Sequence, residues 1–158
     1  MSYEASPLSY QRQRDEAAAF IDDWAQWTHF LTGTYPGERS PSAFNRDYRC
    51  LRDLLSGIGG DTHVPIALAT GPQRSGIPHL HMLVAVPPGY PGDAARLMRR
   101  HWHRLTGGNA QVRRYASSRR AGKYLAAHST WELDYACPRI GRCRRGPCVL
   151  VTSPITLT

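Results

Sequence analysis

Two apolar runs at the centre of the chain restrict its fold more than any other feature. They are VPIALAT at 64–70 and IPHLHMLVAV at 77–86, and only the six residues GPQRSG separate them. Two short apolar runs joined by a turn-forming segment predict the antiparallel strands of one hairpin. The chain must therefore build a sheet around this hairpin.

Helical and strand patterns flank the hairpin in a regular order. Gly and Pro clusters separate the segments, and apolar residues recur at helical spacing on both sides of the hairpin. The predicted elements are a helix over 8–26, a strand over 27–35, a helix that Ser40 and Pro41 open and that Gly57 and Gly59-Gly60 stop, the two hairpin strands, a helix that Asp93 caps and Gly107 ends, a strand over 110–115, and a helix over 119–128 capped by Ser117 or Ser118.

This order predicts an α+β fold. Without the first helix it is β-α-β-β-α-β, the split arrangement of the ferredoxin-like fold, and we expect an antiparallel sheet with helices on one face. The 158 residues suffice for one compact domain with short additions. We expect a helical extension over 1–26, a core domain over 27–130, and a basic, Cys-containing tail over 131–158 that can add a strand.

Cationic residues are concentrated in the second half of the chain. The net charge is +8, and between Arg96 and Arg145 thirteen Lys or Arg residues stand against two acidic residues. Nearly all of them are Arg, whose guanidinium binds phosphate bidentately. Because they are interleaved with aromatic residues and turns, they favour nucleic acid over a membrane surface as the partner. The candidate DNA-binding residues are Arg113, Arg114, Arg119, Arg120, Arg142, Arg144 and Arg145.

The sequence offers no segment for a membrane. It has no run of about 18 apolar residues, and its first residues lack the basic start and apolar stretch of a secretory signal. We expect a cytoplasmic protein without a membrane partner.

Two histidines lie one residue apart on the second hairpin strand. Side chains alternate across a strand, so His79 and His81 share one face while Leu80 and Met82 point into the core on the other. Two imidazoles on one face are candidate metal ligands. By itself the pattern is just as typical of two polar histidines on a solvated sheet face.

Three motifs resemble those of one enzyme family and occur in its order. FLTGTY at 30–35 resembles the first motif of rolling-circle replication initiators, the Rep proteins of the HUH endonuclease superfamily. GIPHLH at 76–81 resembles their histidine-hydrophobe-histidine motif, and AGKYLAAH at 121–128 is similar to the helix that carries their nucleophilic tyrosine. The resemblance covers residues 27–128 and is to the single-tyrosine type.

The resemblance implies a metal-dependent, sequence-specific single-stranded DNA endonuclease and strand transferase. Tyr124 would attack a DNA phosphate and become joined to its 5′ side, leaving a 3′ hydroxyl that primes rolling-circle replication of a plasmid or phage. His79 and His81 would hold a divalent ion, Mg²⁺ or Mn²⁺, that neutralises the phosphate. Lys123 and His128 would supply positive charge near the tyrosine.

The sequence departs from the family pattern at two positions. The family's third metal ligand, often Glu at the end of the preceding strand, has Thr70 and Gln73 as its nearest equivalents, and we favour the amide oxygen of Gln73. The family's Lys three residues after the tyrosine is Ala127 here, so His128 or Lys123 would replace it.

Tyr115 is a second candidate nucleophile. It lies nine residues before Tyr124, at the end of a predicted strand, where an aromatic residue is usually structural. A tyrosine inside a helix can be aimed across the sheet at the histidine face, which favours Tyr124. The two are too far apart to be the paired tyrosines of two-tyrosine initiators.

The cysteines leave a separate metal site open. Four thiolates would suffice for a structural zinc ion, although the spacing in the tail is not the usual zinc-knuckle spacing. Free thiols are the alternative in a reducing compartment. The candidate zinc ligands are Cys50, Cys137, Cys143 and Cys148.

Two functions from different classes follow. The first is the nicking enzyme, acting on single-stranded DNA or an origin hairpin, or a transposase of the same histidine-motif group. The chain lacks a P-loop, because Tyr follows Gly122-Lys123, so a helicase and a polymerase would act in trans. The second is a catalytically decayed, basic nucleic-acid-binding module, with or without zinc, which the missing carboxylate and Lys support.

Overall fold

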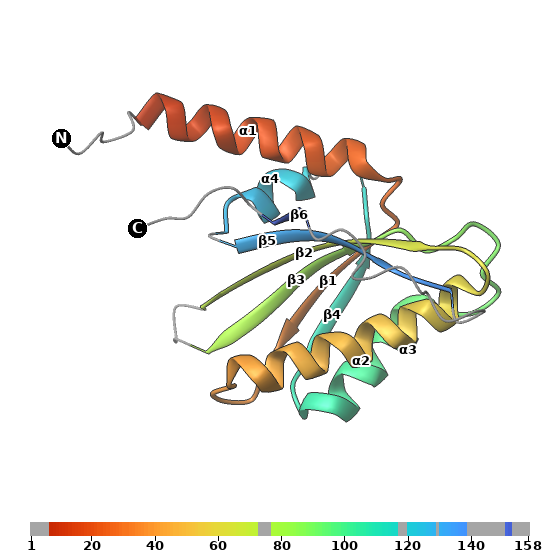
Figure 1. Ribbon diagram of the computed structural model, residues 1–158. Helices are drawn as coiled ribbons and strands as arrows, with labels where there is room; N and C mark the ends of the chain where they lie inside the picture. The colour runs from red at the N-terminus through yellow and green to blue at the C-terminus, as the bar shows by residue number, and fades with distance from the viewer. Residues whose placement is uncertain (1–6, 73–76, 117–119, 129, 139–150, 153–158) are drawn as a thin grey trace.

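A computed structural model describes residues 7–72, 77–116, 120–128, 130–138 and 151–152 (Figure 1). Its elements are α1 (Pro7–Trp24), β1 (His29–Thr34), α2 (Pro41–Gly59), β2 (Val64–Pro72), β3 (Pro78–Val84), α3 (Ala94–Thr106), β4 (Ala110–Arg114), α4 (Ala121–Ala126), β5 (Thr130–Ala136) and β6 (Val151–Thr152). The predicted order of helices and strands is confirmed from α1 to α4.

The strands form one open antiparallel sheet in the order β4-β1-β3-β2-β5-β6. β1 and β2 run parallel with β3 between them, and α2 connects them; β3 and β4 run parallel with β1 between them, and α3 connects them. These are two interleaved split β-α-β units, an arrangement compatible with the ferredoxin-like fold. The α+β class and the antiparallel sheet are confirmed.

Local capping residues start and stop the two connecting helices. The Ser40 side chain accepts a hydrogen bond from the backbone N–H of Ala43, and the Asp93 side chain accepts one from that of Arg96. α3 ends at Gly107, which has a φ of 69° and the left-handed conformation that favours glycine. α2 continues through Gly57 and ends at Gly59, with Gly60 as its C-cap, so of the predicted stop signals the Gly59-Gly60 pair is the one that ends the helix.

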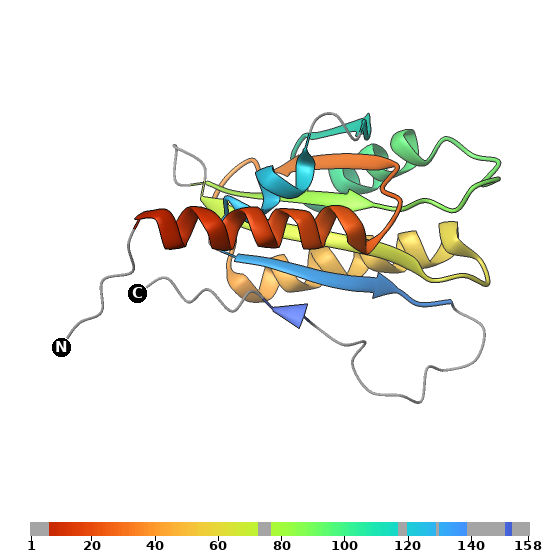
Figure 2. The ribbon, with the colours of Figure 1, turned by 90° about the horizontal axis from the view of Figure 1, so that it is seen from above.

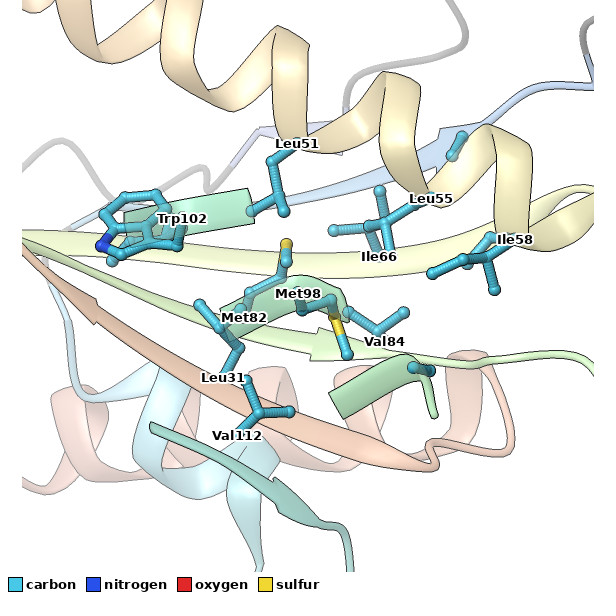
Figure 3. Packing of buried hydrophobic residues seen from close by; sticks show 14 of the residues in the cluster. Leu31, Leu51, Leu55, Ile58, Ile66, Met82, Val84, Met98, Trp102 and Val112 are labelled. Atoms are coloured by element: carbon cyan, nitrogen blue, oxygen red, sulfur yellow. The ribbon is translucent and has the colours of Figure 1, made fainter. Parts of the chain in front are cut away.

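One face of the sheet carries the larger core, which α2 and α3 cover (Figure 3). Leu80 and Met82 of β3 point into it, as the alternation of the strand predicts. Burying a large apolar side chain stabilises the fold by about 1.5–3 kcal/mol. The labelled members of this cluster are Leu31, Leu51, Leu55, Ile58, Ile66, Met82, Val84, Met98, Trp102 and Val112.

The other face of the sheet is also covered, by α1 and α4 (Figures 1 and 2). Ile21 of α1 and Leu125 of α4 are fully buried there. They pack in a second core with Ala67, Ala69 and Leu83, which point away from α2 and α3. The predicted arrangement with helices on one face is therefore wrong, because β2 and β3 are apolar on both of their faces.

Strand β5 begins at the predicted boundary between core and tail. It pairs antiparallel with β2 along its whole length, and Leu133 is fully buried in the second core. The apolar pattern of this strand is interrupted on its other face, where a carboxylate, Asp134, points toward α2. The Asp134 carboxylate accepts a hydrogen bond from Tyr48 at 2.9 Å and pairs with Arg52 at 2.9 Å. A buried charge with partners thus replaces an apolar residue.

Gly33 in the first motif has a packing role. A Cβ on Gly33 would lie 2.7 Å from the ring of Trp102, which is fully buried and donates from its ring nitrogen to the Thr34 carbonyl at 3.1 Å. We expect Gly33→Ala to lower the free energy of unfolding by about 1–3 kcal/mol, measured by urea titration, because the core is overpacked. Gly37→Ala is the control, because a Cβ there meets nothing within 4 Å. Equal losses in both variants would contradict this role.

Candidate functional site

His79 and His81 lie side by side on the sheet face that α4 covers. Their ring centroids are 4.5 Å apart, and both side chains are buried, with 9 % and 3 % exposure. β3 is central in the sheet, so its backbone is held by β1 on one side and β2 on the other. The predicted shared face of the two histidines is confirmed.

Tyr124 lies on α4 directly above these histidines. Its hydroxyl is 3.2 Å from Nε2 of His81, yet 48 % of the residue is exposed. Phe30 of β1 contacts both Tyr124 and His81. Its ring is parallel to that of His81, with the ring centroids 5.9 Å apart, and it meets the Tyr124 ring edge-on, with the centroids 5.8 Å apart. The site therefore combines a tyrosine that is open to solvent with a neighbouring imidazole that is buried.

His128 joins the histidine pair as a third member. The candidate ligand atoms of His79, His81 and His128 all lie within 4.8 Å of one another, and this group could hold a metal ion. Nδ1 of His128 is 3.0 Å from the Tyr124 carbonyl. Metal-binding histidines commonly donate one ring N–H to a carbonyl and bind the ion through the other nitrogen. The sequence predicted an electrostatic role for His128; the structure brings it among the candidate ligands.

Gly71 on β2 explains why His128 can fill this place. It pairs directly with His79, and a Cβ at this position would lie 3.2 Å from the His128 ring. The strand thus offers no side chain here, and the imidazole from beyond α4 occupies the space.

The structure tests one of the two sequence candidates for the third ligand. Thr70 pairs with Leu80 and points to the opposite face, where it lines a small pocket with Tyr48 and Glu132. The alternation of the strand excludes it from the histidine face, so this alternative is wrong. Gln73 lies outside the described residues.

The protonation of the histidines suits a metal site. Burial, and then the neighbouring His79 and His128, lower the pKa of His81 to about 3. Burial and His128 also lower the pKa of His79. Both imidazoles are therefore neutral at pH 7, which is the form that binds metal.

Two observations show that the residues present fit a bound ion. Nδ1 of His79 is buried and has no hydrogen-bond partner within the described part of the chain, although such atoms are normally satisfied. Nitrogens that bind one tetrahedral ion at about 2.1 Å lie about 3.4 Å apart. The candidate ligand atoms of the cluster lie within 4.8 Å of one another, so the three side chains would close around a bound ion by a little more than an ångström.

Thr32 is a site residue that sequence reasoning did not single out. It pairs with His81 across β1 and β3, and its hydroxyl lies 3.2 Å from Nδ1 of His81. A hydrogen bond at Nδ1 orients the ring and leaves Nε2 for other partners. The sequence contains a signal for this position. Thr32 lies in the first motif, and the alternation of side chains along β1 places it on the sheet face opposite to that of its neighbour Gly33.

Lys123 and Tyr115 point toward α1. The ammonium group of Lys123 is 3.7 Å from the Asp15 carboxylate, and no contact between Lys123 and the histidines is found among the described residues. The Tyr115 hydroxyl donates to Oδ1 of Asp22 at 3.1 Å, and burial followed by Asp22 raises its pKa. The contacts of Tyr115 are thus those of a structural residue, whereas Tyr124 faces the histidines.

Asp22 of α1 anchors the start of α4. Its Oδ1 accepts hydrogen bonds from the Gly122 backbone N–H and from Tyr115, both at 3.1 Å. A Cβ on Gly122 would lie 2.5 Å from the Ala18 carbonyl, so only glycine lets the two helices approach this closely. Arg120, just before α4, has a φ of 46° and no side-chain cap, and the predicted caps Ser117 and Ser118 lie outside the described residues. Asp22 therefore supplies the cap that the segment itself lacks.

Removal of this anchor should loosen α4. We expect Asp22→Ala to lower the free energy of unfolding by about 1–3 kcal/mol, because a buried N–H and a hydroxyl lose their acceptor. Hydrogen exchange at Gly122 should accelerate as well. Asp23→Ala, on the exposed side of α1, is the matched control and should change neither quantity. Unchanged exchange at Gly122 in Asp22→Ala would contradict the anchoring role.

A pocket of about 230 Å³ opens beside Tyr124. Its walls include Phe30 and Tyr115 as well as Gln111 and Arg113 of the edge strand β4. Arg113 donates to the Gln111 side-chain oxygen at 3.3 Å.

The predicted DNA-binding arginines are only partly placed by the structure. Arg113 and Arg114 line this pocket, and Arg120 is exposed before α4. The remaining four lie outside the described residues: Arg119, Arg142, Arg144 and Arg145.

The structure gives no support to the zinc hypothesis among the residues it describes. Cys50 and Cys137 form no disulfide bond within the described part of the chain, and Cys143 and Cys148 lie outside it. The Cys50 carbonyl contacts His101 of α3, whereas the Cys137 carbonyl accepts from Ser56, nearly two turns further along α2. Within the described part of the chain, the three histidines are the one group of this kind that could hold a metal.

Comparison with protein-family models, curated proteins and solved structures found no significant match to this chain. None of the described helices combines the length and apolar character needed to cross a membrane.

Proposed function

We propose that this chain is a single-tyrosine DNA endonuclease and strand transferase of the HUH class, which nicks a replication origin to start rolling-circle replication of a plasmid or phage. The observation that carries the proposal is the position of Tyr124, a half-exposed residue whose hydroxyl lies 3.2 Å from Nε2 of His81. A nucleophile beside a cluster of three candidate metal ligands is the arrangement that attack on a phosphodiester requires.

The reaction divides into one bond formed and one bond broken. The Tyr124 oxygen attacks the phosphorus in line with the departing 3′ oxygen, and the phenol proton passes to solvent, to which the half-exposed tyrosine is open. The phosphorus–3′-oxygen bond breaks, and the 3′ oxygen takes up a proton. The products are a 5′ phosphate joined to Tyr124 and a free 3′ hydroxyl, and attack by another 3′ hydroxyl would reverse the linkage and join strands.

His79, His81 and His128 would hold a divalent ion, which supplies neutralisation of a non-bridging phosphate oxygen when bound. Imidazole nitrogens suit transition metals, whereas Mg²⁺ prefers oxygen ligands. Of the two ions expected from the sequence, this donor set favours Mn²⁺. Phe30 holds the His81 and Tyr124 rings in register by contacting both.

The pocket beside Tyr124 supports a single-stranded substrate. Its volume of about 230 Å³ is below the range of about 300–1,000 Å³ for drug-sized ligands, so it fits one splayed-out base. Phe30 and Tyr115 offer aromatic surfaces for stacking, and Arg113 offers a guanidinium for the backbone. A base becomes available in this way when the strand is unpaired, as in the loop of an origin hairpin, with helicase and polymerase acting in trans.

The proposal is tested by adduct formation. Purified protein is incubated with labelled single-stranded oligonucleotides from its own replicon, with Mn²⁺ or with EDTA, and run on a denaturing protein gel. We expect a covalent protein–DNA band that requires the metal. Tight DNA binding without an adduct, on substrates that include the origin, would favour a non-catalytic binding module and overturn the proposal.

A further inference from the structure

α3 carries a row of arginines on its outer side. The inner side of the helix is fully buried at Met98 and Trp102, whereas four exposed arginines follow one another at spacings of three, one and four residues. Residues three and four apart are neighbours on a helix, so the four share one side. This arginine stripe consists of Arg96, Arg99, Arg100 and Arg104.

The stripe is not neutralised within the described part of the chain. None of its four arginines forms an ion pair there, and α3 itself contains no acidic residue. Other helices differ, because Arg12 of α1 pairs with Glu16, and Arg46 of α2 lies 3.8 Å from Asp47. Like charges three and four residues apart destabilise a helix, as does a cation in its first turn. A row of unpaired arginines therefore lowers the stability of α3 unless an anionic partner binds to it.

We propose that the arginine stripe is a docking surface for the sugar–phosphate backbone of duplex nucleic acid. From Arg96 to Arg104 it is about 12 Å long at 1.5 Å per residue. Guanidinium groups bind phosphates bidentately, and the packed inner side of α3 holds the row rigid.

The composition of the stripe favours a duplex over a single strand. Single-strand binding surfaces use aromatic side chains on which bases stack. The one aromatic residue of α3, Trp102, is fully buried, whereas Tyr124 on the opposite face of the sheet is half-exposed. α3 and α4 lie on opposite faces of the sheet (Figure 1). Duplex binding by the arginine stripe is therefore a function separate from the proposed nicking, because it requires neither Tyr124 nor a metal. On an origin hairpin, the stripe would bind the double-stranded stem.

The test compares two charge-matched double variants. Binding of a labelled blunt DNA duplex and of a single strand of the same length is measured by fluorescence anisotropy over a salt series, in EDTA. Arg96→Gln/Arg100→Gln should lower the slope of log affinity against log salt for the duplex by about 1.8, since each phosphate contact contributes about 0.9. Its affinity for the single strand should stay within twofold. Arg12→Gln/Arg46→Gln removes the same charge from arginines that have carboxylate neighbours, and should leave the duplex slope unchanged.

Three results would overturn the proposal. Equal losses of duplex affinity in both double variants would mean that only net charge matters. Equal losses on duplex and single strand in the stripe variant would remove the preference for a duplex. Binding of the wild-type chain to anionic lipid vesicles in place of the duplex would assign the stripe to a membrane. Arg99→Gln/Arg104→Gln repeats the test if the first pair fails to fold, and the Tyr124→Phe chain should bind duplex normally whether or not the nicking function holds.

Discussion

Replacing Tyr124 with phenylalanine is expected to eliminate the covalent protein–DNA adduct and to lower nicking at least about 1,000-fold. The phenyl ring keeps its edge-on contact with Phe30 but loses the only oxygen that can bond to phosphorus. Because the residue is half-exposed and the hydroxyl has one hydrogen-bond partner among the described residues, His81, its removal should cost little stability. DNA affinity should therefore survive while the chemistry stops. The measurement is the denaturing-gel assay with Mn²⁺, beside an anisotropy titration of the same oligonucleotide.

Tyr115→Phe is the matched control. Its hydroxyl donates to Asp22, not to a histidine, so its removal should weaken the anchoring of α4 but leave adduct formation intact. An adduct that persists in Tyr124→Phe and disappears in Tyr115→Phe would reverse the assignment of the nucleophile. An adduct that persists in both variants would show that neither tyrosine is the nucleophile.

Loss of any histidine in the cluster is expected to weaken metal binding strongly. His79→Ala, His81→Ala and His128→Ala should each weaken Mn²⁺ affinity by more than about 100-fold, because loss of residues that only orient metal-bound histidines already costs about 10–100-fold. Isothermal titration with Mn²⁺ and with Zn²⁺ measures this directly and needs no DNA. Chelation of the wild-type chain by EDTA should reproduce the loss of nicking, and added Mn²⁺ should restore it.

His103→Ala is the control for the histidine variants. His103 is exposed on α3, and its ring contacts the Gly108 carbonyl away from the cluster, so metal affinity should not change.

His128→Ala is the most informative of the histidine variants, because the position of His128 in the cluster depends on tertiary contacts. Wild-type affinity in His128→Ala would show that the third ligand is elsewhere, for example at Gln73. Gly71→Ala should also weaken binding, because its methyl group would meet the His128 ring.

Local periodicity predicted most of the fold. Alternation on β3 placed His79 and His81 on one face and Leu80 on the other, and the caps Ser40 and Asp93 started α2 and α3 where expected. These features depend on neighbours in the chain, so a sequence pattern is sufficient to read them. α4 was less well predicted, because it has six residues and its cap comes from Asp22 of α1.

The candidate site also combines features that the local sequence predicts with features that depend on tertiary packing. Strand alternation and helical spacing were enough to predict that two histidines share one strand face and that Tyr124 lies on a helix. Contacts between distant segments bring His128 into the cluster, leave room for it at Gly71, and turn Lys123 toward Asp15. The tertiary structure also decided that β5 joins the sheet through a buried, paired Asp134. The reason is physical: local pattern decides which side of an element is apolar, whereas the packing of distant segments decides which side chains meet.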